Sequence, residues 1–180
     1  VPSESNPRPD WTASVKIGKG KSTGHYYILD AKRLQQRPDG VLKHIIEVAL
    51  EDGDGVNLVL PKDGGAGGAV AHQYYRRVLA EHGIPTKSSV VSGHSGKIAR
   101  FSPFSSLCES GNVSMLDSSG MDENWNTWYI DCLEAFSGQR KDWDDPVDAT
   151  SDAANYCMKT TALPNFKINM MYQASPIPTI

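Results

Sequence analysis

Four aspartates, Asp142, Asp144, Asp145 and Asp148, fall within seven residues of this sequence. A helix-forming run from 149 to 158 follows them directly. Pro146 suits the first position of a helix, because its missing N–H would have no partner there. We therefore predict that Asp145 is the N-cap of a helix and that Asp148 lies on its first turn.

The chemistry of such a cluster follows from its charge. Carboxylates held together repel one another and raise each other's pKa unless a cation neutralises them. Mg²⁺ and Mn²⁺ prefer carboxylate oxygen, so Asp144, Asp145 and Asp148 are candidate ligands for a divalent ion. A second interpretation stays open, because aspartates at a helix start also stabilise the helix dipole without any metal.

A further acid, Asp63, follows a short aliphatic run at 56–60 and precedes five small residues at 64–68. The run is typical of a buried strand. The glycines allow close approach of a backbone or a phosphate, and their N–H groups can bind an anion. A flexible turn is the alternative, but an acid placed directly after a strand favours a functional role.

Basic residues occur at two places that could contact a phosphate. Lys97 and Arg100 follow Gly93 and Gly96 at a predicted helix start. There they could bind a DNA phosphate or neutralise charge in a transition state. Lys19 and Lys21 lie in a glycine-rich loop that we expect at the tip of a β-hairpin. Solvated surface charge is the alternative for both groups.

Hydrophobic periodicity and Gly/Pro punctuation predict the elements that must position these residues. The expected order is two strands followed by alternating helices and strands, with two helices at the end. This order indicates an α/β domain in which helices flank a mixed sheet. Sites in such domains form at the carboxyl ends of strands. Strands are expected at 12–17, 25–30, 56–60, 84–91 and 112–116, and helices at 38–49, 69–82, 98–108, 125–136 and 146–158.

Composition narrows the class of protein. A chain of 180 residues with 39% hydrophobic and 22% charged residues is typical of one soluble globular domain. No apolar run approaches the ~20 residues of a membrane span. The net charge of −3 neither indicates nor excludes nucleic-acid binding. The three scattered cysteines fit neither a disulfide framework nor a zinc site, which favours a reducing compartment.

Taken together, several segments resemble the nuclease domain of tailed-phage large terminases, the subunits of the DNA-packaging motor. The segments are PDWTA at 9–13, YYILD at 26–30, LPKDGGAGG at 60–68, GKIARFSP at 96–103, GNV at 111–113 and DDPVDA at 144–149. The resemblance implies a ribonuclease-H-like fold with a mixed central sheet. It also implies cleavage of concatemeric double-stranded DNA with two Mg²⁺ or Mn²⁺ ions, which would together stabilise an in-line phosphodiester attack.

Residue by residue, the resemblance makes Asp63 the acid at a strand end, and Asp145 and Asp148 the third acidic element with Asp144 beside them. Lys97 matches a basic residue near the family's active site. The implied partners are double-stranded DNA, the terminase ATPase domain, the small terminase subunit and the portal or procapsid, in the cytoplasm of a host cell. The sequence holds no Walker A motif, so the ATPase domain itself is not expected here.

We expect the nuclease domain to span residues 1–160 and a tail or arm to follow at 161–180. The family also carries an aspartate on a strand upstream of Asp10, and we expect that strand to be missing, with weak metal binding and DNA cleavage as a consequence. Two alternatives stay open. One is a Holliday-junction-resolvase-like nuclease. The other is a non-catalytic module of the packaging motor that docks the portal through the tail from Pro164 onward.

Overall fold

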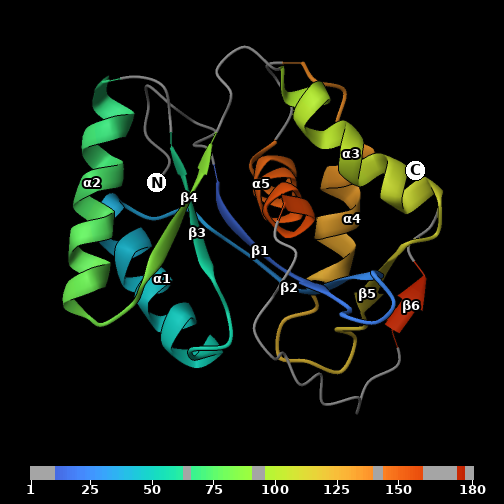
Figure 1. Cartoon of the computed structure of the whole chain (residues 1–180), viewed down its shortest axis with the longest axis horizontal. Helices are drawn as coiled ribbons and strands as arrows, with labels where there is room; N and C mark the ends of the chain where they lie inside the picture. The colour runs from blue at the N-terminus through green and yellow to red at the C-terminus, as the bar shows by residue number, and fades with distance from the viewer. Residues whose placement is uncertain (1–10, 63–65, 91–95, 140–143, 160–173, 177–180) are drawn as a thin grey trace. The chain divides into compact units, whose positions relative to one another are not determined.

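The computed structural model describes residues 11–62, 66–90, 96–139, 144–159 and 174–176. The chain divides into two compact units. The first comprises residues 1–35, 96–163 and 167–180, and the second comprises residues 36–95 and 164–166. Figure 1 labels the elements of both units.

The first unit is built on a four-stranded mixed sheet with the order β1-β2-β5-β6. Strand β1 (Thr12–Lys19) pairs antiparallel with β2 (Tyr26–Leu34), which runs parallel to β5 (Val113–Leu116). Strand β6 (Ala174–Pro176), from the predicted tail, pairs antiparallel with β5. The expected hairpin between β1 and β2 is confirmed.

Three helices complete this unit: α3 (Lys97–Glu109), α4 (Asn126–Glu134) and α5 (Asp145–Lys159). The buried face of α5 carries small or compact residues at helical spacing, which lets the helix pack closely on the strands. Its Cys157 thiol lies 3.7 Å from the carbonyl oxygen of Ile17 in β1. The buried core that these helices share with the sheet includes Ile28, Phe101, Phe104, Met115, Trp125, Tyr129, Val147 and Ala154.

The second unit is a helix followed by a β-α-β arrangement. Helix α1 (Pro38–Asp52) precedes β3 (Leu58–Lys62), α2 (Ala66–Glu81) and β4 (Thr86–Val90), and the two strands pair in parallel. Leu42, Leu60, Leu79 and Ile84 form its core. Strand β3 continues through Pro61 and Lys62, so the sequence position of Asp63 directly follows a strand.

The predicted α/β class and the order of elements are confirmed, with β6 as an additional strand. We predicted one central sheet. Among the described strands, however, β3 and β4 pair only with each other and form a second, two-stranded sheet. In the part of the chain that the structure describes, no helix is both long and apolar enough to cross a membrane.

Candidate acidic site at the start of helix α5

Helix α5 begins one residue earlier than the sequence suggested. The backbone N–H of Asp148 donates to the carbonyl oxygen of Asp144 at 2.8 Å, and Asp145 is the first helical residue. Asp144 is therefore at the N-cap position, and the prediction of Asp145 as the cap was wrong by one residue. The helix tolerates Pro146 at its second position because the N–H groups of the whole first turn lack intrahelical partners.

This shift decides which carboxylates face the same way. Residues four apart lie on one face of a helix, whereas a neighbouring residue is turned by about 100°. Asp144 and Asp148 therefore share a face, and Asp145 points elsewhere. Burial is the main reason that the pKa of the Cys132 thiol in α4 is raised; Arg33 lowers it, and the charges of Asp131 and, least of all, Asp145 raise it further.

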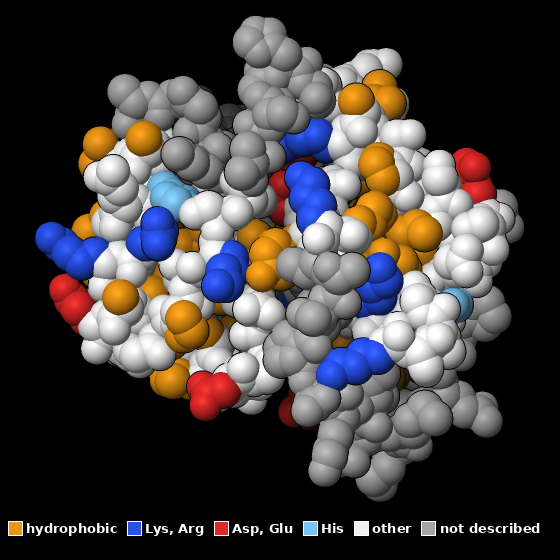
Figure 2. Space-filling view, viewed as in Figure 1, with side chains coloured by type: hydrophobic (Ala, Val, Ile, Leu, Met, Phe, Trp, Pro, Cys, Tyr) orange, Lys and Arg blue, Asp and Glu red, His pale blue; other side chains and the backbone are white. Residues whose placement is uncertain are grey.

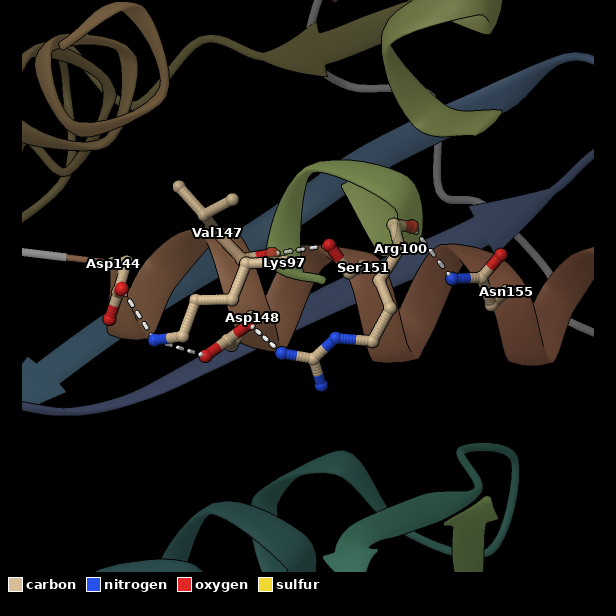
Figure 3. A network of polar contacts seen from close by, with 7 residues as sticks. All are labelled: Lys97, Arg100, Asp144, Val147, Asp148, Ser151 and Asn155. Atoms are coloured by element: carbon tan, nitrogen blue, oxygen red, sulfur yellow. Dashed lines mark hydrogen bonds and ion pairs between the residues drawn. The ribbon is translucent and has the colours of Figure 1, made fainter. Parts of the chain in front are cut away.

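Lys97, the first residue of α3, joins the two carboxylates that share a face. Its Nζ contacts Oδ2 of Asp144 and lies 3.0 Å from Oδ2 of Asp148. Figure 3 shows the lysine side chain reaching across to the first turn of α5, with its ammonium between the two carboxylates. Two oxygen ligands from different residues thus converge on a single positive charge.

Two opposing effects act on the pKa of Lys97. Burial of the ammonium lowers it, while the hydrogen bonds and charges of Asp144 and Asp148 raise it. The ion pairs outweigh burial, so the pKa of Lys97 is raised above its usual value. The ammonium therefore stays charged at neutral pH.

Arg100 lies one helical turn after Lys97 and contacts the same acidic residue. Its Nη2 donates to Oδ1 of Asp148 at 2.5 Å, and the amide of Asn155 donates to its backbone carbonyl at 3.0 Å. Both contacts are drawn in Figure 3. The Nε of Arg100 is buried and has no hydrogen-bond partner among the described residues. Arg100 thus fixes α3 against α5.

Two buried hydroxyl groups, those of Thr150 and Tyr129, stabilise the first turn of α5. The hydroxyl of Thr150 donates to the carbonyl oxygen of Pro146 at 2.6 Å. The phenol of Tyr129 lies 2.9 Å from the same Thr150 oxygen and must be the donor there, because a threonine hydroxyl has one hydrogen. Ser151 repeats the pattern with a 2.8 Å bond to the carbonyl of Val147. The acidic turn is therefore held by side chains of its own helix and of α4.

The sequence did not assign roles to Tyr129, Thr150 or Asn155. Thr150 and Ser151 follow Pro146 and Val147 by one helical turn, and this spacing was a detectable sign that their hydroxyls could bond back to the backbone. Tyr129 and Asn155 are different, because their contacts depend on how α3, α4 and α5 pack. No local pattern encodes that packing.

The structure brings together Asp144, Asp148, Lys97 and Arg100 of the predicted site. Asp63 lies outside the described residues.

Lys19 is the last residue of β1, with its Nζ 5.2 Å from the centroid of the Tyr26 ring, and Lys21 follows in the exposed turn. Figure 2 shows Lys and Arg side chains at separate places on the visible face, with acidic as well as uncharged groups beside them. DNA contact by Lys19 and Lys21 stays a prediction.

The acidic pair fits a divalent cation in part. The described residues contain no group of three or more His, Cys, Asp or Glu side chains placed to hold a metal ion. Asp144 and Asp148 nevertheless converge on one ammonium, as ligands of a shared cation would. Mg²⁺ often takes only one or two carboxylates and completes its shell with water and phosphate oxygens. Two convergent carboxylates therefore suffice for one such ion.

Comparison with known proteins gave one result. The model of the family described as terminase RNaseH-like domain matches residues 2–157. The match includes the acidic start of α5, the α3 cations and the whole of the second unit's βαβ arrangement. No curated protein and no solved structure matches the chain.

Proposed function

Because the chain belongs to the terminase RNaseH-like domain family, we propose that it is the metal-dependent endonuclease domain of a viral DNA-packaging terminase. In this role it cuts concatemeric double-stranded DNA during genome packaging. The observation that carries the proposal is the convergence of Asp144 and Asp148 on one cation. Such a pair could hold one Mg²⁺ or Mn²⁺ ion for phosphodiester hydrolysis.

The residues of the proposed site would have different roles. Asp144 and Asp148 would hold the ion, with Asp145 and Asp63 as the further carboxylates that the resemblance implies. The bound ion would supply Lewis-acid stabilisation of a phosphate oxygen. Arg100 keeps the Asp148 carboxylate in place through its 2.5 Å bond. Guanidinium groups suit phosphates well, so Arg100 would also be a candidate to contact a phosphate oxygen.

In this role the chain would be one part of a DNA-packaging motor. Its partners would be double-stranded DNA, the terminase ATPase domain, the small terminase subunit and the portal or procapsid, in the host cytoplasm. These partners follow from the family and not from a surface of the described residues. Phosphodiester hydrolysis consumes no ATP, so the isolated chain is expected to bind DNA, and to cut it weakly, without ATP.

Plasmid nicking tests the proposal. The purified chain should convert supercoiled plasmid to open circles in the presence of Mn²⁺ and without strong sequence preference. Asp148→Asn, Asp145→Ala and Asp63→Ala should abolish nicking, while Asp131→Asn, an exposed acid on α4, should leave it unchanged. Undiminished nicking by Asp148→Asn would refute the site. A four-way junction cut much faster than linear duplex would favour the resolvase alternative instead.

A further inference from the structure

Lys97 already occupies the position between the two carboxylates that the proposed ion would need. The charges of Asp144, Asp148, Lys97 and Arg100 sum to zero, so these four side chains balance one another without any metal. A divalent ion bound to the same carboxylates would lie next to the Lys97 ammonium. The two positive charges would then repel each other at short range in a partly buried site, where such repulsion is poorly screened.

The two cations of α3 differ in how firmly they are held. The side chain of Arg100 is 17% exposed, and Asn155 holds its backbone carbonyl. The side chain of Lys97 is 41% exposed, and its residue opens the helix. Lysine also has a long flexible stem that can reorient at little cost, whereas the arginine fork is fixed by its geometry. Of the two cations, Lys97 is therefore the one that can be displaced from the carboxylates of Asp144 and Asp148.

We propose that Lys97 is a displaceable internal counter-ion of the acidic site, which holds Asp144 and Asp148 together in the metal-free protein and is released when Mg²⁺ or Mn²⁺ binds. This inference rests on the proposed function, because it concerns the same ion and the same carboxylates. It adds a regulatory property: the domain keeps the charges of Asp144 and Asp148 paired until the metal arrives.

Release of Lys97 also has a consequence for the substrate. Once displaced, the ammonium would carry an unpaired positive charge beside the two carboxylates. A DNA phosphate is the natural new partner for it, because phosphate oxygens bind ammonium groups strongly. Metal and DNA should therefore bind cooperatively, since each favours the position of Lys97 that suits the other.

Lysine labelling can observe the release directly. The full chain is treated briefly with an amine-reactive acylating reagent, with and without saturating Mn²⁺, and modification of each lysine is measured by mass spectrometry. Lys43, whose side chain is 79% exposed on α1, serves as the internal reference. Relative to Lys43, labelling of Lys97 should be slow without metal and at least about threefold faster with Mn²⁺, because a weak partly exposed ion pair is lost. Asp144→Asn should raise Lys97 labelling without metal.

A calorimetric Mn²⁺ titration of the same samples separates the possible failures. If Mn²⁺ binds but Lys97 labelling does not change, the ion is accommodated beside the lysine and only the displacement is overturned. If no Mn²⁺ binds at all, the metal site of the proposed function fails and the displacement fails with it.

The matched variants give a second measurement. Lys97→Gln should bind Mn²⁺ about fivefold more tightly than the wild type, since no ion pair has to be broken first. Lys159→Gln, a change of the same chemistry at the exposed end of α5, should not alter the affinity. Weaker Mn²⁺ binding by Lys97→Gln would contradict the proposal, because it would make the lysine a support of the bound ion.

Discussion

The backbone N–H of Asp148 donates to the carbonyl of Asp144 at 2.8 Å, and the side chains of the same two residues share the ammonium of Lys97. One helical turn therefore fixes both acids relative to each other. A helix holds such a pair more accurately than a loop does, because its backbone hydrogen bonds define the spacing. The acidic pair is thus ready to share a cation before any ligand arrives.

The hydrogen bond between the buried hydroxyls of Tyr129 and Thr150 should be important for the stability of the fold. Thr150→Val removes the acceptor of the Tyr129 phenol and leaves that buried O–H without its 2.9 Å partner. The free energy of unfolding should fall by about 1–3 kcal/mol, the usual cost of an unsatisfied buried donor. Urea denaturation followed by tryptophan fluorescence measures the change.

Two further variants make that test specific. Thr150→Ser keeps the hydroxyl and should lose less stability than Thr150→Val. Adding Tyr129→Phe to Thr150→Val removes the orphaned phenol, so the double variant should be more stable than the sum of the single changes predicts. Strict additivity would show that the two hydroxyls do not interact.

The guanidinium of Arg33 should contribute through stacking rather than through charge alone. It lies 4.6 Å from the ring centroid of Trp11 and 4.5 Å from that of Trp128. Arg33→Lys keeps the charge but loses the planar group, and should cost about 1–2 kcal/mol in unfolding free energy. The neighbouring Lys32, 3.9 Å from Asp30 in an ion pair, provides the control. Lys32→Met should change stability by less than about 0.5 kcal/mol, and equal losses in both variants would contradict the stacking.

Two buried thiols should make the protein less stable at alkaline pH. Burial raises the pKa of Cys108 to about 11 and that of Cys157 to about 11, from 9.0 for a free thiol. The thiols ionise more readily in the unfolded chain, so their contribution to stability is complete below pH 9.0 and is lost as the pH rises towards about 11.

The measurement is the urea midpoint at several pH values between about 8.5 and 9.5, below the range where unfolded tyrosines and lysines titrate. Stability should decline with pH in the wild type and decline less steeply in the Cys108→Ala/Cys157→Ala variant. Parallel curves would show that the thiols ionise equally in the folded and unfolded chain.

The order of helices and strands was predictable because local signals set it. Pro38 opens α1, and Gly53, with φ of +67°, ends it in a conformation that favours glycine. The acidic site was predictable in composition but not in geometry. The cap at Asp144 moved the helix start by one residue, and this changed the partner of Asp148 from Asp145 to Asp144.

The contacts between segments that are far apart in the sequence could not be predicted from the sequence alone. Lys97 and Arg100 reach Asp148 because α3 packs on α5 through buried residues such as Phe101 and Val147. That packing depends on the shapes of many side chains at once, and no spacing in the sequence records it. The separate pairing of β3 with β4 is of the same kind, since strand partners depend on the whole fold.

A metal ion at the start of α5 is central to the proposed function, and an isothermal titration of the chain with Mn²⁺ tests it directly. The wild type and Asp131→Asn should bind Mn²⁺ with equal affinity. Asp148→Asn should bind at least about tenfold more weakly, because it loses a carboxylate ligand. Equal affinity in Asp148→Asn, or no binding by the wild type, would contradict a metal site at the start of α5.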